Sequence, residues 1–245
     1  MQNNPTGQTQ GTYDLLDAFK EEGCPICALG LRSVAHYIES INYDSVGDPG
    51  VRQQLKAALG FCNLHAYQWL HAAFILGTAD IYQDVVRLIA DDLRARSYHA
   101  CALADRVRSL FTEHGDDVTA GHLLRPSASC PACAVLGETE DRLTKTLVYA
   151  LGDGGFRAAY VASAGHCVPH LRIALSVAPT AEAFATLRDH ALQTEETLLM
   201  QLAEIIRKHD YRYRYEPTGV EKGAAARAVA HVAGAQGIAK LQVIK

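Results

Sequence analysis

Eight cysteine and histidine residues fall into four short motifs whose residue types and spacing suit metal binding. Two are Cys-Pro-x-Cys motifs, at residues 24–27 and 130–133, and two are Cys-x-x-His motifs, at residues 62–65 and 167–170. The motifs of each half are similarly spaced, with 35 positions from Cys27 to Cys62 and 34 from Cys133 to Cys167. Six of the seven cysteines belong to these motifs. The repetition indicates two equivalent metal sites.

The donor set favours zinc. Four ligands drawn from thiolate sulfur and imidazole nitrogen form closed, tetrahedral structural zinc sites. A Cys-x-x-Cys or Cys-x-x-His pair at a helix start lets both side chains reach one ion, and the free N–H groups there stabilise thiolate. We predict two zinc ions per chain, each bound within one half of the sequence. The predicted ligand sets are Cys24, Cys27, Cys62 and His65, and Cys130, Cys133, Cys167 and His170.

Other chemistries fit the same residues. An iron–sulfur cluster can be bound by three cysteines and one histidine. A thiol–disulfide pair at Cys24 and Cys27 would make a redox sensor, although no βαβ pattern accompanies the motif. The cysteines could also be buried core residues, but this would not explain their repetition. His166 could replace His170 as a ligand, since it adjoins Cys167.

The segments that carry the motifs show helical periodicity. In the first half we expect helices at about 13–22, 26–43 and 63–76, with Asp48-Pro49 opening another that Gly60 ends. Residues 78–114 contain neither Gly nor Pro and predict one long helix or two nearly collinear ones. Cys101 lies in this stretch, where we expect an ordinary thiol.

The second half repeats this plan. Cys130-Pro131 opens a helix, and residues 152–157 stand where residues 47–52 stood, 105 positions earlier. Pro179-Thr180 begins a second long helix, and residues 220–232 suit a terminal one. No segment alternates apolar and polar residues in the way strands do. We therefore predict an all-α bundle of two pseudo-symmetric repeats, each a Cys3His metal cassette followed by a long helix.

The predicted organisation has five parts. They are a disordered lead-in at 1–12, a first metal-binding repeat at 13–114, a linker at 115–129, a second repeat at 130–211, and a C-terminal strap and helix at 212–245.

Basic and aromatic residues alternate in the segment from Arg207 to Pro217. Such a pattern can stack on bases and pair with phosphates. We favour a strap that packs Tyr211, Tyr213 and Tyr215 against the bundle and leaves its arginines solvated or paired with Asp210 and Glu216. A nucleic-acid partner is possible but not favoured.

Composition narrows the class of protein. The 245 residues are 49% apolar, and the net charge of −4 argues against a protein whose whole surface binds nucleic acid. No apolar run reaches the roughly 18 residues that would predict a membrane span. The first residues do not form a signal peptide, and seven cysteines without an export signal indicate a reducing cytoplasm.

Several motifs resemble an uncharacterised family of bacterial cytoplasmic helical proteins. They are Cys-Pro-x-Cys-Ala, Val-x-Asp-Pro-Gly-Val-Arg at 46–52, Gly-Phe-Cys-x-x-His-Ala at 60–66, and Lys-His-Asp-Tyr-Arg-Tyr-Arg with Glu-Pro at 208–217. The resemblance covers Asp14 to Ala233. It implies a bacterial source and a C-terminal motif that belongs to the domain, and it implies no activity. This chain has Thr218 where the family often has an aromatic residue after Glu-Pro.

Together these features predict a binding or regulatory module with two structural zinc sites, whose partner is an unknown protein or small molecule. The alternatives are an iron–sulfur or thiol redox sensor and a metalloenzyme with a pocket between the repeats. An enzyme is less favoured, since a catalytic zinc keeps a coordination position open and four protein ligands would fill it.

Overall fold

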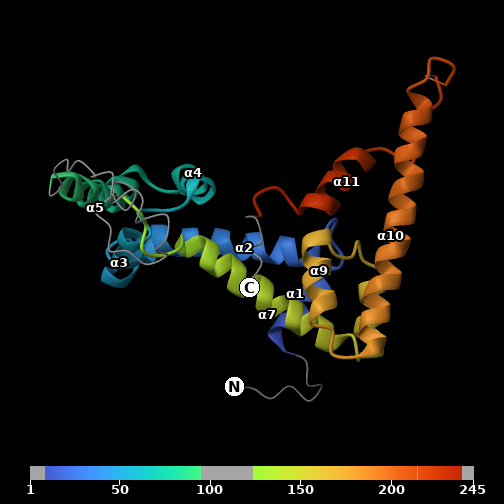
Figure 1. Ribbon diagram of the computed structural model, residues 1–245, viewed down its shortest axis with the longest axis horizontal. Helices are drawn as coiled ribbons and strands as arrows, with labels where there is room; N and C mark the ends of the chain where they lie inside the picture. Colours follow the sequence, from blue (N-terminus) through green and yellow to red (C-terminus); the bar gives the residue numbers. More distant parts are fainter. Residues whose placement is uncertain (1–8, 95–123, 214, 239–245) are drawn as a thin grey trace, which may run out of the picture. The chain divides into compact units, whose positions relative to one another are not determined.

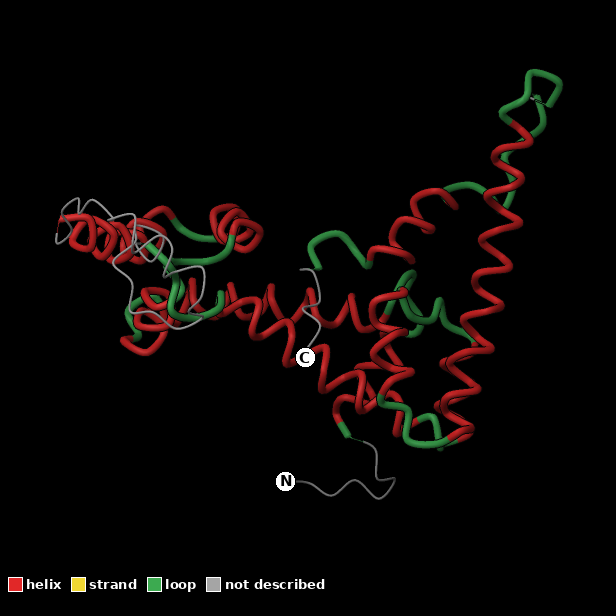
Figure 2. Tube along the Cα trace, viewed as in Figure 1, coloured by secondary structure: helices red, strands yellow, loops and turns green. Residues whose placement is uncertain are grey.

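The computed structural model describes residues 9–94, 124–213 and 215–238, and every regular element in these ranges is helical (Figures 1 and 2). The predicted all-α fold is thus confirmed. The α-helices are α1 (Gln10–Ala18), α2 (Pro25–Ser40), α3 (Pro49–Ala57), α4 (Asn63–Ala72), α5 (Ile75–Arg94), α7 (Pro131–Ala150), α8 (Gly154–Val161), α9 (Val168–Ser176), α10 (Ala181–Lys208) and α11 (Ala224–Ala233), with a π-helical turn, η1, at Ile41–Ser45. None of the helices in these ranges is long and apolar enough to cross a lipid bilayer.

The chain forms two compact units that cut across the two halves of the sequence. The terminal unit comprises Met1–Ser33 and Leu136–Lys245, and the central unit comprises Val34–Val135. The boundaries therefore fall inside α2 and α7. As a result, each unit contains the Cys-x-x-Cys motif of one half and the Cys-x-x-His motif of the other.

The core of the terminal unit joins α1, α2 and the helices from α7 to α10. Phe19 of α1's C-terminal end meets Phe156 and Tyr160 of α8 edge-on, with ring centroids 5.2 and 5.8 Å apart. Helices α2 and α7 approach closely at Gly30, where an added Cβ would lie 2.8 Å from Cδ1 of Leu136. This close approach fixes the start of α2 against the unit's core.

The central unit is held by an aromatic core and by a charge cluster between α3 and α5. Trp69 is fully buried, stacks on Phe61 and donates its indole N–H to Thr78 over 3.1 Å. Arg52 of α3 forms ion pairs of 2.7 Å with both Asp80 and Asp84 of α5. Trp69 is thus a packing residue of the central unit.

Two aspartates, 105 positions apart in the sequence, each cap a helix. Asp48 accepts a hydrogen bond from the backbone N–H of Val51 over 2.9 Å, and Asp153 accepts one from that of Phe156 over 2.8 Å. Each satisfies a backbone donor that has no partner in the first turn. The helix start predicted at Asp48-Pro49 is confirmed.

Some helix ends differ from the predictions. α2 ends at Ser40 and continues into the π-helical turn η1. The helical conformation is interrupted between α4 and α5, at Ala73 and Phe74. There the side chain of Asn42 accepts a hydrogen bond from the backbone N–H of Phe74 over 3.0 Å, which competes with helix continuation. The rest of the predicted long helix, including Cys101, and most of the predicted linker lie outside the described residues.

The segment from Arg207 to Pro217 lies at the tip of α10 (Figure 1) and does not form the predicted strap. Tyr211 is 78% exposed and Tyr215 is 82% exposed, so the prediction that they pack against the bundle is wrong. Instead, Arg207 and Arg212 lie over the ring of Tyr213. In a turn of this kind, aromatic rings and charged side chains can contact one another. The sequence pattern does not distinguish such local contacts from packing against the bundle.

Two arginines of this segment pair with carboxylates of the segment and of the last turns of α10. Arg212 forms an ion pair with Asp210, and Arg207 pairs with Glu204 and Glu216. The pairing with Asp210 and Glu216 agrees with the prediction.

Candidate metal centres

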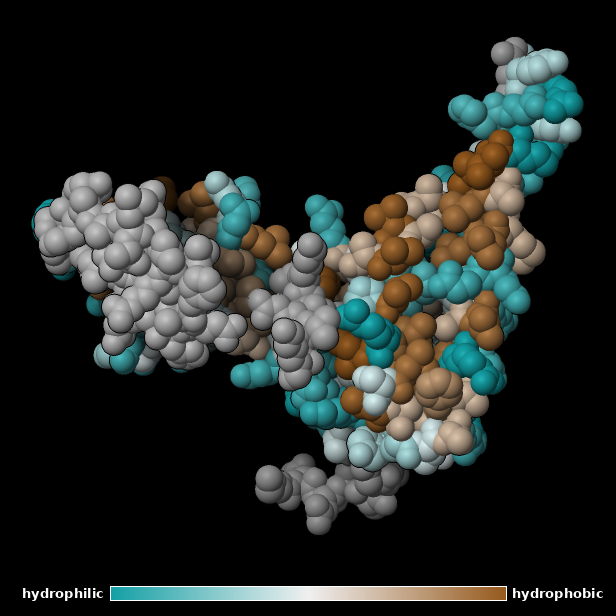
Figure 3. Space-filling model, viewed as in Figure 1, coloured by the Kyte–Doolittle hydropathy of each residue, from teal (hydrophilic) through white to brown (hydrophobic). Residues whose placement is uncertain are grey.

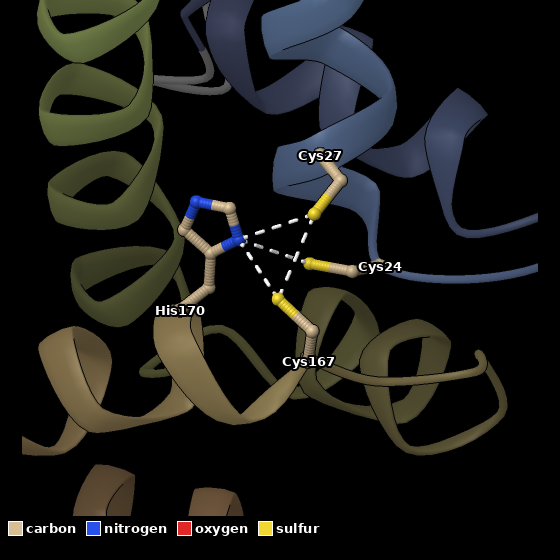
Figure 4. A group of neighbouring side chains, drawn as sticks. All are labelled: Cys24, Cys27, Cys167 and His170. Carbon is tan, nitrogen blue, oxygen red and sulfur yellow. Dashed lines mark hydrogen bonds between the residues drawn. The ribbon is translucent and has the colours of Figure 1, made fainter. Parts of the chain in front are cut away.

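The first group of metal-binding side chains, here the terminal centre, lies wholly within the terminal unit. Cys24 and Cys27 at the start of α2 meet Cys167 and His170 at the start of α9 (Figure 4). Nδ1 of His170 lies 3.5, 3.4 and 3.1 Å from the sulfurs of Cys24, Cys27 and Cys167, and the sulfurs of Cys27 and Cys167 are 3.6 Å apart. The four ligand atoms therefore converge on one point.

The second group, the central centre, lies wholly within the central unit. Nδ1 of His65 lies 3.3 Å from the sulfurs of both Cys62 and Cys133 and 3.6 Å from that of Cys130. The sulfurs of Cys62 and Cys133 are 3.6 Å apart. The two centres thus have the same ligand types, the same imidazole nitrogen and nearly the same spacings.

These spacings suit one tetrahedral ion in each centre. Zinc bonds of about 2.3 Å to sulfur and about 2.05 Å to nitrogen place two sulfurs about 3.8 Å apart and sulfur and nitrogen about 3.6 Å apart. In each group all four ligand atoms lie within 4.8 Å of one another. Both groups could therefore hold a metal ion.

The structure corrects the predicted pairing of the motifs. Each Cys-x-x-Cys meets the Cys-x-x-His of the other half of the sequence, not the one that follows it. The cause is the length of α2 and α7, whose 16 and 20 residues extend about 24 and 30 Å. Each carries the chain from one unit into the other before the next motif is reached. The two halves have equivalent motifs, so spacing alone does not reveal the exchange.

Both Cys-x-x-His motifs are positioned by the same local structure, a helix N-cap that follows a glycine with positive φ. Cys62 and Cys167 are the N-cap residues of α4 and α9, with extended backbone, and the histidines lie in the first turn of each helix. Gly60 and Gly165 turn the chain into these caps with φ of +92° and +72°. At Gly165 a side chain would also collide with the ring of His190, whose Cε1 would lie 2.6 Å from an added Cβ.

The thiols of the terminal centre favour ionisation of Cys24 and oppose that of Cys27. Hydrogen bonds with Cys167 and Cys24, together with burial, raise the pKa of Cys27 far above its ordinary value. Burial acts against ionisation of Cys24 too, but hydrogen bonds with Cys167, Cys27 and His170 outweigh it and hold its pKa well below the ordinary value. A divalent cation would stabilise all three thiolates at once, which the protein groups alone cannot do.

A buried carboxylate lies behind the histidine of the terminal centre. Oε1 of Glu140 on α7 is 3.2 Å from Nε2 of His170, in an ion-pair contact whose geometry falls short of a hydrogen bond, and both side chains are buried. Burial lowers the pKa of His170, but hydrogen bonds with Cys167 and Cys24 and the contact with Glu140 outweigh it and raise the pKa to about 11. A carboxylate in this position orients a metal-binding imidazole and makes it a stronger ligand.

Among the described residues, the central centre has no such carboxylate partner, and it is less enclosed. Nε2 of His65 is buried and has no hydrogen-bond partner in the part of the chain that the structure describes. Cys62, Cys130 and Cys133 are partly exposed, whereas Cys27, Cys167 and His170 are buried. The two centres therefore differ in their surroundings, although their ligands are alike.

Three residues around the terminal centre were not found from the sequence. Glu140 is one of several acidic residues in α7, so nothing in the pattern marks it as buried. The ring of Tyr160 contacts the rings of both His166 and His190, and its hydroxyl oxygen lies 2.9 Å from Nδ1 of His166. His170, rather than the neighbouring His166, therefore completes the ligand group.

The comparisons with known proteins identify the family. Residues 8–237 match a "Family of unknown function (DUF6062)". The chain belongs to this family. The resemblance noted from the sequence motifs is thereby confirmed, and membership assigns no activity.

One relative matches along its whole length. It is an "Uncharacterized 23.9 kDa protein in xynA 3'region" of Caldicellulosiruptor sp. (strain Rt8B.4), 25% identical over 224 residues that make up 91% of this chain and 100% of that protein. No solved structure matches the chain.

Proposed function

We propose that both centres bind structural zinc and that the protein works in the bacterial cytoplasm as a binding or regulatory module. The convergence of three sulfurs and one imidazole nitrogen at tetrahedral spacing, found twice, carries this proposal. Such a ligand set is typical of closed zinc sites that fix the fold around them. A reducing compartment would keep the thiols available, since disulfides are rare there.

The geometry favours a single ion over a multi-iron cluster. All four ligand atoms of each centre fall within 4.8 Å of one another. A cluster of several iron and sulfide ions would hold its ligands farther apart, because the cluster atoms lie between them. Four protein ligands also fill the coordination sphere of a tetrahedral zinc, so a catalytic role at either ion is not proposed.

Elemental analysis of protein purified under anaerobic conditions tests the proposal. We expect about two zinc ions per chain, colourless protein, and the spectrum of tetrahedral cobalt thiolate after exchange with cobalt. Brown protein containing iron and acid-labile sulfide would favour the cluster sensor instead. Protein that contains less than one metal ion per chain, despite growth with zinc and reduced thiols, would overturn the proposal.

A further inference from the structure

A cavity of about 740 Å³ lies in the terminal unit beside the metal centre. Its size falls within the range of about 300–1,000 Å³ that is usual for small-molecule pockets. Figure 3 shows apolar residues gathered along α10 and α11, the helices that border it. Leu31, Val161, Leu198, Ala226 and Ala230 are among the apolar residues that line the cavity. A molecule that fits this wall must itself be mainly apolar.

Outside the metal centre, the formal charges of the lining balance. Glu22 and Arg227 are its formally charged residues within the described chain, and both are exposed. The side chain of Arg227 donates to the side-chain oxygen of Gln201 and to the backbone oxygens of Lys222 and Val220. Because these opposite charges lie at the exposed part of the lining, the wall outside the metal centre has no excess charge that would select an ion.

One buried polar group of the lining has an unused hydrogen-bonding atom. His166 is 4% exposed, and its Nδ1 is 2.9 Å from the hydroxyl oxygen of Tyr160. Its Nε2 is buried without a hydrogen-bond partner in the described part of the chain. Buried polar atoms are nearly always satisfied, so an orphaned one on a residue that lines a cavity points to a ligand.

The Tyr160 contact determines what this atom offers. Tyr160 is fully buried, and His166 is the hydrogen-bond partner that the structure shows for its hydroxyl. A buried hydroxyl needs an acceptor for its proton, so Tyr160 donates to Nδ1 of His166. The neutral ring then carries its proton on Nε2. His166 therefore presents an N–H donor to an occupant of the cavity.

We propose that the cavity binds an uncharged, mainly apolar small molecule whose carbonyl or hydroxyl oxygen accepts a hydrogen bond from Nε2 of His166. This deepens the proposed binding role and rests on it. Cys24, Cys27 and Cys167 line the same cavity, so the bound molecule lies against the metal centre. The zinc site would thereby hold one wall of the pocket in place.

Binding of 2-decanone to the zinc-loaded full-length chain tests the proposal, because this ketone has an apolar chain and a single acceptor oxygen. Titration calorimetry measures its affinity. Infrared spectra of the ketone labelled with ¹³C at the carbonyl report whether its oxygen accepts a hydrogen bond. We expect saturable binding of one molecule per chain and a shift of the carbonyl band to lower frequency on binding.

Two neighbouring positions on α11 provide a matched pair of variants. Ala230 lines the cavity, whereas the neighbouring Val229 is 68% exposed and does not line it. We expect Ala230→Trp to weaken ketone binding at least tenfold and Val229→Trp to leave it unchanged. Should Ala230→Trp not fold, Gln193→Phe in the lining of α10 and Leu192→Phe beside it make the same comparison.

His166 tests the polar contact. We expect His166→Phe to weaken binding about three- to tenfold, the loss of one hydrogen bond, and to abolish the carbonyl shift. His166→Gln, which retains an N–H donor, should restore part of the shift. The inference is overturned by a chain with two zinc ions that does not bind the ketone, by equal affinities in the matched variants, or by an unchanged carbonyl band in His166→Phe. Zinc content, measured in each sample, shows separately whether the metal proposal holds.

Discussion

Cys27 and Cys167 are 140 positions apart in the chain, yet their sulfur atoms lie 3.6 Å from each other. Cys62 and Cys133 form the equivalent contact in the central unit, also at 3.6 Å. Each centre thus joins a helix start from one half of the sequence to a helix start from the other, and this exchange can be tested by counting metal ions.

Double variants distinguish crossed ligand sets from sequential ones. Cys24→Ser with Cys167→Ser removes two ligands of one centre, so this protein should retain about one zinc per chain. Cys24→Ser with Cys62→Ser removes one ligand from each centre and should leave almost none. Sequential pairing requires the reverse result, so elemental analysis of the two proteins, with circular dichroism as a control for folding, decides between the pairings.

Metal removal should occur in two phases. The ligands of the terminal centre are more enclosed than those of the central centre, so a chelator should remove the central ion at least tenfold faster. Release followed with a colorimetric zinc indicator checks this. The variant Cys62→Ser should show the slow phase alone, and Cys167→Ser the fast phase alone. A single phase in the wild-type protein, with equal rates in both variants, would contradict the assignment.

Glu140 should strengthen zinc binding at the terminal centre. Loss of such an outer carboxylate typically costs about 10- to 100-fold in metal affinity. We expect Glu140→Gln to weaken one of the two ions by this factor in a competition titration. Glu138→Gln, an exposed change two residues earlier on α7, should have no effect. Equal affinities in the two variants would show that the 3.2 Å contact with His170 does not tune the ion.

Two glycines should respond to alanine in opposite directions. Gly165→Ala places a side chain at φ of +72° and against the ring of His190, so it should lower the melting temperature and loosen the Cys167 cap. Gly137→Ala lies inside α7 with open space around it, where alanine should stabilise by about 0.5–1 kcal/mol. Thermal unfolding followed by circular dichroism measures both, and a stable Gly165→Ala protein would contradict the predicted clash.

The tip of α10 should contribute little to stability through Tyr211. Its side chain is 78% exposed, so Tyr211→Ala should change the free energy of unfolding by no more than about 0.5 kcal/mol. Phe156→Ala, at a position 2% exposed, should cost about 3–5 kcal/mol. Denaturant unfolding of the two variants provides the measurement. A large loss of unfolding free energy in Tyr211→Ala would support the packed strap that was predicted from the sequence.

Local features of this fold were predictable from the sequence because they depend on neighbouring residues. Asp48 and Asp153 cap helices wherever the rest of the chain goes, and cysteine paired with cysteine or histidine at helix starts suits metal binding in any fold. The crossing of the ligand sets was not predictable, since it depends on which unit the chain enters at the end of α2 and of α7. Burial of Glu140 and exposure of Tyr211 likewise depend on tertiary packing.

The crossed ligand sets also impose an order on assembly as the chain leaves the ribosome. The central centre needs Cys133 and the terminal centre needs His170, so neither can be completed by the first 130 residues. At synthesis rates of about 5–20 residues per second, the nascent chain exposes Cys24 and Cys27 for several seconds before their partners emerge. The cysteines of the first half can therefore join a four-ligand site only after the ligands of the second half have been synthesised.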